Sequence, residues 1–433
     1  MKRREEAGGA SGRQRPHSDD AWRILAARGL RQFAYGLLGV TLAIALSEDG
    51  FSPVAIGGLL TAALVGDFCA TYLISLFADR WGRRRTLIWL ALIMAATGAV
   101  YGLTRLYPAL LLAAFAGTLG TSTSETAPFL PIEQAMLPQT CAPDRRTALF
   151  ARYNLIASLA GALGALAAGA ADLLTRAGLP RGQAFNLMFG AYAIVALAVA
   201  LLVGRLTPQV EALRARSSAT KDTEGATGWQ AWRRLVPPLG SSRGIILRLS
   251  GLFSLDALAG ALVTQSLLAL YFHLRFGVSL SALAILFFGA NLLSALSFLA
   301  AAPLARRFGL LNTMVFTHLP SNALLMLVAL MPTFPLAGVT LLARQLLSQM
   351  DVPTRQAYTM ALTPPEERTA AASVTSLARS AGSGLSPTIS GALLTGPLVV
   401  LGLPLLIGGG LKVVYDLALW AVFRHVRPPD ERR

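Results

Sequence analysis

Long apolar stretches, separated by short stretches rich in glycine, proline and charged residues, recur along the whole chain. About 20 apolar residues in a helix cross the hydrocarbon of a bilayer, so each stretch is long enough for one span. The expected spans are 24–46, 53–77, 87–104, 108–136, 148–170, 184–204, 245–272, 281–301, 311–331, 335–360, 371–395 and 400–423. We therefore predict an all-α polytopic membrane protein with twelve transmembrane helices.

The spans form two sets of six around a polar stretch that contains Pro237-Pro238 and reads as a solvated linker. We predict five segments, which are an N-terminal tail (1–23), a first half (24–204), the linker (205–244), a second half (245–423) and a C-terminal tail (424–433).

Two motifs of the first half recur in the second half in the same register. Pro131-Ile-Glu-Gln-Ala recurs as Pro353-Thr-Arg-Gln-Ala, and Pro143-Asp-Arg-Arg-Thr-Ala recurs as Pro365-Glu-Glu-Arg-Thr-Ala. The first motif marks the end of the fourth span of its half, and the second marks the loop that enters the fifth span. We expect a parallel repeat of two pseudo-symmetric six-helix halves that enclose a cavity near the membrane midplane.

The composition excludes several classes of protein. Hydrophobic residues make up 54% of the chain and charged residues 14%, against about 25% charged in soluble proteins. Two cysteines exclude a disulfide scaffold, and four scattered histidines without ligand spacing predict no metal and no other cofactor. The strings HxxxD and HExxH are absent, so we predict that the protein is not an enzyme. An intramembrane enzyme and a sensor that retains a transporter fold are the alternatives.

The distribution of basic residues predicts the orientation. The net charge is +16. In the predicted topology, the loops on the side opposite the N-terminus carry only four basic residues, Arg105, Arg176, Arg181 and Arg275. The positive-inside rule therefore predicts a multi-pass protein of the plasma or inner membrane with both termini and the linker in the cytosol. The first 20 residues lack the apolar core of a signal peptide. Because the basic residues occur in short bursts, we expect contact with membrane lipid and none with nucleic acid. We also expect a monomer.

A motif between the second and third spans carries a family resemblance. The segment Ser75-Leu-Phe-Ala-Asp-Arg-Trp-Gly-Arg-Arg-Arg-Thr-Leu87 resembles the signature G-x-L-a-D-r-x-G-r-k-x-x-l of the major facilitator superfamily, although Ser75 and Phe77 replace Gly and Leu. A shorter copy, Pro303-Leu-Ala-Arg-Arg-Phe-Gly309, occupies the equivalent place in the second half and lacks the acid. The resemblance implies a transporter in which spans one, four, seven and ten line the cavity.

The resemblance also implies a cytosolic gate, formed by Asp79, Arg80, Gly82 and Arg83. In this family the acid of the motif is held against the start of the eleventh helix, where unpaired N–H groups stabilise a carboxylate. Arg145 or Arg146 are further candidate partners. Arg84 and Arg85 are interpreted as positive-inside anchors.

Polar residues inside the spans mark the expected cavity, because each ionisable group there costs at least about 2.5–3.5 kcal/mol on insertion scales. In span ten, Arg344, Asp351 and Arg355 follow one helical stripe with Ser348. The alternative is a salt-bridge ladder that pairs its own charges. The expected cavity residues are Ser122, Glu125, Gln265, Arg344, Gln345, Ser348, Gln349 and Asp351.

Three acids are candidates for proton coupling: Asp256, Glu125 and Asp67. Asp256 is predicted to lie about 16 Å deep by the helical rise. Its own helix carries no charged residue one turn away, and burial then favours the protonated acid. The alternative is a hydrogen-bonded structural acid.

Further charges are assigned by depth and spacing. Glu133 and Arg355 occupy equivalent positions in the two halves and are predicted to bridge at the cytosolic gate, while Arg379 is placed to neutralise Asp351. Lys412 and Asp416 read as a self-neutralising pair at i, i+4. Arg28 and Arg31 read as snorkelling side chains, and His318 as structural.

We therefore predict a secondary transporter that moves a small organic solute by alternating access, with proton-coupled efflux favoured. Arg344, Arg355 and Arg379 indicate an anionic or amphipathic solute, because guanidinium groups bind carboxylates and phosphates. Span four lacks the arginine of antiporters and span five lacks a Gly-Pro step. The alternative is therefore a uniporter or a proton symporter that imports an anionic metabolite.

Overall fold

The computed structural model describes residues 18–117, 119, 128–141, 146–210, 240, 242–364 and 367–426, and no side chain for 18, 75–80, 138, 146–148, 151, 209 or 368–370. The first bundle contains α1 (Ser18–Glu48), α2 (Pro53–Trp81), α3 (Arg83–Leu103), α4 (Tyr107–Ala116), α5 (Phe129–Met136), α6 (Arg146–Ala167), α7 (Ala170–Arg176) and α8 (Arg181–Gly204). The second contains α10 (Arg243–Ala261), α11 (Gln265–Phe276), α12 (Leu280–Phe308), α13 (Leu310–Leu330), α14 (Phe334–Ser348), α15 (Asp351–Ala361), α16 (Arg368–Ser383), α17 (Ser386–Leu393), α18 (Leu398–Leu401) and α19 (Leu403–Phe423).

The all-α membrane fold is confirmed. Within the described ranges, nine helical stretches are long and apolar enough to cross a membrane. Of the other three predicted spans, 335–360 and 371–395 are each divided between two shorter helices. The span 108–136 contains α4 and α5, and most residues between them lie outside the described set. The count of twelve crossings stays a prediction. α1 begins at Ser18, within the predicted N-terminal tail, and the segment bounds stay predictions.

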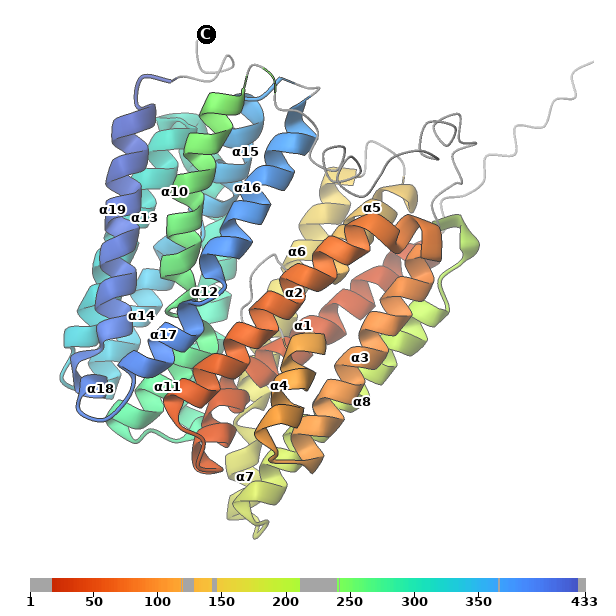
Figure 1. Ribbon diagram of the computed structural model, residues 1–433, viewed down its shortest axis with the longest axis vertical. Helices are drawn as coiled ribbons and strands as arrows, with labels where there is room; N and C mark the ends of the chain where they lie inside the picture. The colour runs from red at the N-terminus through yellow and green to blue at the C-terminus, as the bar shows by residue number, and fades with distance from the viewer. Residues whose placement is uncertain are drawn as a thin grey trace, which may run out of the picture.

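The two bundles diverge toward one side of the molecule (Figure 1). This side holds the start of α1, the end of α8, the start of α10 and the end of α19, and we call it the terminal side. Toward the opposite side, the bundles meet where α2 packs against α17 and α1 packs against α11. α6 also packs against α12. The structure is therefore closed on the side opposite the chain ends.

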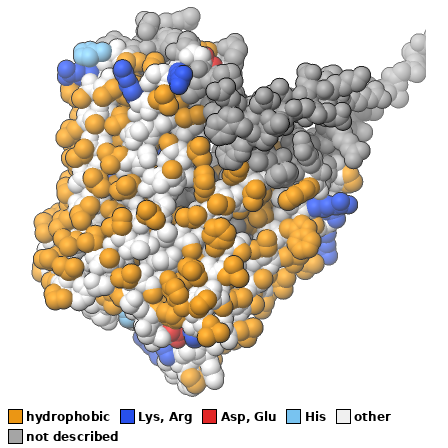
Figure 2. Space-filling model, viewed as in Figure 1, with side chains coloured by type: hydrophobic (Ala, Val, Ile, Leu, Met, Phe, Trp, Pro, Cys, Tyr) orange, Lys and Arg blue, Asp and Glu red, His pale blue; other side chains and the backbone are white. Residues whose placement is uncertain are grey.

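Hydrophobic side chains cover the middle of the visible face, and Lys and Arg side chains lie toward its ends (Figure 2). Large apolar side chains such as Trp89, Ile194 and Leu299 are more than 60% exposed. In water such a surface would drive association, whereas lipid chains solvate it. This pattern agrees with a multi-pass membrane protein.

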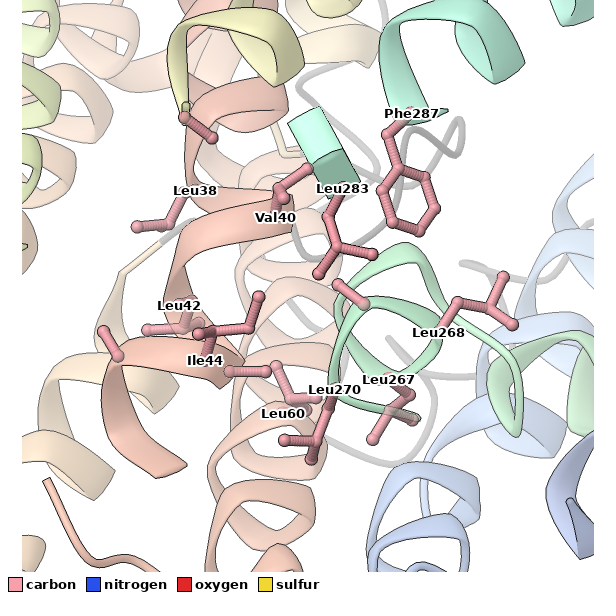
Figure 3. Packing of buried hydrophobic residues seen from close by; sticks show 14 of the residues in the cluster. Leu38, Val40, Leu42, Ile44, Leu60, Leu267, Leu268, Leu270, Leu283 and Phe287 are labelled. Atoms are coloured by element: carbon pink, nitrogen blue, oxygen red, sulfur yellow. The ribbon is translucent and has the colours of Figure 1, made fainter. Parts of the chain in front are cut away.

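Buried apolar residues from both bundles close the side opposite the chain ends (Figure 3). Leu42 and Ile44 of α1 lie near Leu270 of α11 in one hydrophobic cluster. The backbones also approach closely there, since a Cβ on Gly391 of α17 would overlap the carbonyl oxygen of Pro53 at the start of α2. This contact depends on the absence of a side chain.

A polar contact joins the bundles on the same side. The carboxylate of Asp172 in α7 accepts a hydrogen bond from the Ser281 N–H at the start of α12, at 2.6 Å. Arg181 donates to Asp172 and also to both oxygens of Glu48, each at 2.9 Å. A carboxylate at a helix N-terminus is stabilised by the unpaired N–H groups of the first turn. The contact therefore strengthens closure on this side.

Glycines make the two equivalent turns between the second and third helices of each bundle. Gly82 has φ +93° and Gly309 has φ +83°, values that residues with a Cβ rarely adopt. The repeat seen in sequence thus includes a shared backbone conformation.

Candidate substrate cavity

A cavity of about 680 Å³ lies between the two bundles. Gln134 of α5 and Asn154 of α6 line it from the first bundle, whereas α10, α11, α14, α15 and α16 contribute most of the wall. The lining residues predicted from sequence are Gln265, Arg344, Gln345, Ser348, Gln349 and Asp351. Ser122 and Glu125 lie outside the described residues.

Asp256 is the centre of an ion-pair cluster in the cavity wall, not an isolated acid. Its Oδ1 lies 2.6 Å from Lys412 Nζ. Its Oδ2 lies 3.2 Å from Arg355 Nη1 and 3.0 Å from Arg379 Nη1. The prediction of an uncompensated carboxyl was wrong because the three cations come from α15, α16 and α19, not from its own helix. These three cations compensate the charge of the Asp256 carboxylate.

The stripe on the tenth predicted span faces the cavity and partly pairs with itself. Arg355 Nη1 lies 2.9 Å from Asp351 Oδ2, one turn earlier on α15. Arg379 bonds Asp256 instead of Asp351, which corrects the predicted pair. The stripe therefore lines the cavity and also contains one salt bridge between its own residues, so each of the two interpretations describes part of it.

Arg344 is the cation of this stripe that lacks a carboxylate within bonding distance. Its Nη1 donates to Oε1 of Gln345 at 3.3 Å, and its Nε has no hydrogen-bond partner. The same Gln345 oxygen accepts from Ser348 at 2.7 Å. A guanidinium with open donor positions thus faces the cavity.

Arg31 and Glu133 form a buried ion pair within the first bundle. Arg31 Nη1 and Nη2 lie 2.5 and 2.7 Å from the two Glu133 oxygens, and Tyr153 donates to Glu133 at 2.5 Å. Arg31 is 0% exposed, so the prediction that it snorkels was wrong. The predicted bridge between Glu133 and Arg355 is not formed, because each group bonds partners in its own bundle and the bundles diverge on this side.

Arg28 is a functional candidate that sequence reasoning missed. It lines the cavity from α1 and is only 9% exposed, yet none of its nitrogens has a hydrogen-bond partner in the part of the chain that the structure describes. Its guanidinium lies 4.8 Å from the Tyr153 ring centroid. The sequence did contain a signal for Arg28, because this residue lies in α1, the first of the spans expected to line the cavity. Its interpretation as a snorkelling residue set that signal aside.

Lys412 and Asp416 do not neutralise each other through a direct bond. Lys412 bonds Asp256, whereas Asp416 accepts hydrogen bonds from His318 and Asn322 on α13. The i, i+4 prediction was wrong because both side chains reach partners on neighbouring helices. His318 also lines the cavity.

Asp67 lies in the first bundle outside the cavity lining. It is 8% exposed, and its Oδ1 has no hydrogen-bond partner among the described residues. Its assignment to proton coupling stays a prediction.

The gate motif is described only in part. Gly82 makes the turn after α2, and Arg83 Nη1 donates to the Ala135 carbonyl at 3.4 Å. Arg84 donates to the Gly204 carbonyl at the end of α8, so it does more than anchor the chain. The side chains of Asp79 and Arg80, and Arg145, lie outside the described residues, and so does the Arg146 side chain. The gate roles stay predictions.

The cavity wall is positively charged. Its described lining carries five cations, Arg28, Arg344, Arg355, Arg379 and Lys412, against two carboxylates, Asp256 and Asp351. Among the described residues, no group of three His, Cys, Asp or Glu side chains is placed to hold a metal ion. The chemistry of this surface is that of an anion-binding site.

The family model described as Major Facilitator Superfamily matches residues 24–349, which is most of the chain. The chain belongs to the major facilitator superfamily. The family and fold are those of membrane transporters, whose members bind small-molecule solutes.

Similar proteins support this assignment. The chain is 26% identical over 412 residues to the uncharacterized membrane protein YJR124C of Saccharomyces cerevisiae, covering 91% of this chain and 92% of the relative. The nucleoside transporter NupG (D323A mutant) has a similar structure, with a TM-score of 0.72, 14% identity, and coverage of 93% of this chain and 100% of that one. The human organic anion transporter MFSD10 (TETRAN) superposes with a TM-score of 0.60 at 18% identity, covering 94% and 100%. At these identities the structures show the shared fold.

Proposed function

We propose that this superfamily member is a secondary transporter that moves a small organic anion by alternating access. The observation that carries the proposal is the pair Arg28 and Arg344. One comes from each bundle, both line the cavity, and neither forms an ion pair among the described residues. Arg355 and Arg379 already bond Asp256, which leaves the first pair for the solute.

The position of this pair suits alternating access. A solute that bonds both arginines connects the two bundles, so its binding energy favours a state in which the bundles approach each other. Each guanidinium presents planar N–H donors that match a carboxylate or phosphate. An anion also offsets the excess positive charge of the wall.

The charge of the cavity favours symport over antiport. In antiport the proton and the solute compete for the protein, whereas a proton taken up by this wall makes it more positive and strengthens anion binding. Import of an anionic metabolite by proton symport is therefore the scheme that the geometry supports best. Proton-coupled efflux, the scheme favoured by sequence, stays a second prediction. Asp67, Glu125 and Asp256 remain the sequence candidates for coupling, with Asp256 disfavoured by its three cations.

The decisive experiment is transport in proteoliposomes. Purified protein is tested with labelled lactate, succinate, benzoate and citrate, with pH gradients of either direction. Symport predicts uptake that increases when the outside is acidic, and antiport predicts stimulation when the proton gradient opposes solute movement. Absence of transport for all four anions, with transport of a neutral solute such as a nucleoside, would reject the anion proposal.

Arg28→Gln and Arg344→Gln provide the residue test. A hydrogen bond to a charged group contributes about 1.5–3 kcal/mol, so each change should weaken anion binding roughly 10- to 100-fold. The matched control is Arg306→Gln, since Arg306 lies near the end of α12 outside the cavity lining. Affinity is measured by anion-dependent thermal stabilisation of the purified protein. Equal affinity in all three variants would contradict the assigned roles.

We further propose the plasma or inner membrane as the location, with both termini and the linker in the cytosol, and a monomer as the working unit. The excess of Lys and Arg in the predicted cytosolic loops supports the orientation. Under this orientation the structure is open to the cytosol.

A further inference from the structure

A cluster of buried polar side chains lies between α13 and α19, beside the cavity. Nδ1 of His318 lies 2.9 Å from Oδ1 of Asp416, and Nδ2 of Asn322 donates to Oδ2 of Asp416 at 2.8 Å. The exposed fractions of the three residues are 3%, 0% and 0%. The transport role proposed above uses none of them.

Asp416 lacks a cation that bonds it directly. Lys412 is one turn earlier on α19, but its Nζ bonds Asp256 at 2.6 Å. The described partners of Asp416 are thus a neutral amide and an imidazole. A buried carboxylate without a cation is strongly disfavoured, and a protonated imidazole in direct contact removes that penalty.

His318 is placed to take up that proton. Nδ1 faces the Asp416 carboxylate, and the amide nitrogen of Asn322 lies 3.2 Å from the same atom. In the tautomer that donates Nδ1–H to Asp416, the free lone pair of the neutral ring is on Nε2. Nε2 has no hydrogen-bond partner in the described chain, and the residue lines the cavity. Water in the cavity can therefore deliver a proton to this atom.

We propose that His318 and Asp416 form a proton-binding site of the second bundle. A proton from cavity water binds the Nε2 lone pair, and the resulting imidazolium keeps its Nδ1–H on the Asp416 carboxylate. No other bond breaks, and the pair passes from net negative to neutral.

The surrounding charges have opposite effects on the protonated imidazole of His318. Asp416 and Asp256 stabilise the imidazolium, whereas Lys412, Arg344 and Arg355 oppose it. The elements packed against α13 are α12, α14, α15 and α19. Their ionisable residues are Arg306, Arg307, Arg344, Asp351, Arg355, Tyr358, Lys412, Tyr415 and Asp416, with Asp256 added by α10. Of these, Asp416 is the group in direct hydrogen-bond contact with the imidazole.

The coupling role of this site rests on the anion transport proposed above. A charged His318 adds a positive charge to the cavity wall, so a bound proton and a bound anion strengthen each other's binding. When the proton leaves, Asp416 attracts Lys412, its i, i+4 neighbour, away from Asp256. The site therefore links proton release to a rearrangement of the charges around the solute.

The first test measures the proton without any solute. Protein labelled with ¹⁵N-histidine is placed in lipid nanodiscs, and the ring nitrogens are followed by NMR as a function of pH. The His318 signal is identified as the one that is absent in His318→Asn. We expect this signal to show uptake of a proton as the pH falls, with a midpoint that changes in Asp416→Asn. No titration of His318 in the wild type, or a midpoint that Asp416→Asn leaves unchanged, would overturn the proposal.

The second test concerns coupling. His318→Asn keeps an amide donor for Asp416 but cannot be protonated, so it should abolish acid stimulation of uptake of the anion that wild type transports best among lactate, succinate, benzoate and citrate. The matched control is His273→Asn on α11, where Nδ1 lies 3.0 Å from the Val278 carbonyl, and it should keep the stimulation. Stimulation retained in His318→Asn would refute the coupling role. If wild type transports none of the four anions, the anion proposal fails while the NMR titration still decides the proton site.

Discussion

Arg31 is a fully buried arginine whose charge is balanced inside its own bundle. Such a pair is held by mutual attraction and by the Tyr153 hydrogen bond, while both charges have lost their hydration. The contrast with Arg28, one turn earlier on α1, is instructive. One arginine bonds a carboxylate and serves stability, and the other has open donors and faces the cavity.

This contrast gives a stability prediction. Glu133→Gln leaves the Arg31 charge buried without a counter-charge and should reduce the free energy of unfolding by about 3–5 kcal/mol. The double variant Arg31→Met/Glu133→Leu removes both charges and should recover most of that loss. Thermal unfolding of the purified variants, followed by tryptophan fluorescence, measures both. If Glu133→Gln were as stable as wild type, the ion pair would contribute nothing to the free energy of unfolding.

At the scale of elements, small residues set how closely helices approach. A Cβ on Gly36 of α1 would overlap the Gly161 carbonyl oxygen of α6, and one on Gly164 would overlap the Phe33 carbonyl oxygen. Small residues of the fifth predicted span thus allow a helix pair within one bundle to pack closely. Gly391 plays the same part between bundles, where α17 meets α2.

Gly391→Val should therefore open the side opposite the chain ends. The valine side chain cannot be accommodated against Pro53 without moving α17 from α2, so the closed contact is lost. Spin labels at Ser52 and Thr395, in a background with Cys69 and Cys141 replaced by serine, should report a longer distance. Gly410→Val is the control, because a Cβ there meets no atom within 4 Å. An unchanged distance in Gly391→Val would argue against closure by this contact.

At the scale of the molecule, the bundles diverge on the terminal side (Figure 1), and the cavity lies between them. The opposite side is closed by an apolar cluster and by the Asp172 contact with α12. A solute that bonds Arg28 and Arg344 would shift the population toward bundles that approach on the terminal side.

Accessibility tests this arrangement. Ser376→Cys in the cavity wall should react with a charged thiol reagent added from the side that carries the chain ends, and Ser52→Cys should react from the other side. A transported anion should slow labelling of the first and spare the second. Labelling of Ser376→Cys from the opposite side alone would mean that the resting state is closed on the terminal side.

Sequence predicted the fold well because each feature that specifies it is local. Twenty apolar residues cross a bilayer whatever their neighbours, and the order of polar residues on α14 and α15 already placed Arg344 and Asp351 in the cavity wall. Apart from Arg31, which was expected to snorkel and is buried, the predictions that failed concerned pairing. Asp256 seemed isolated because its three cations lie far along the chain, and Lys412 seemed paired because Asp416 is near in sequence.

The chain itself thus determined the membrane class, the all-α fold and the superfamily, because hydrophobic length and a loop motif are read along one dimension. Only the tertiary structure decided which charges are neutralised, since inside the membrane a charge bonds the nearest partner in space. In the folded protein, Arg28 and Arg344 keep donor positions for a solute, whereas Glu133 forms an ion pair with Arg31. His318 lies beside the Asp416 carboxylate, which no cation bonds directly.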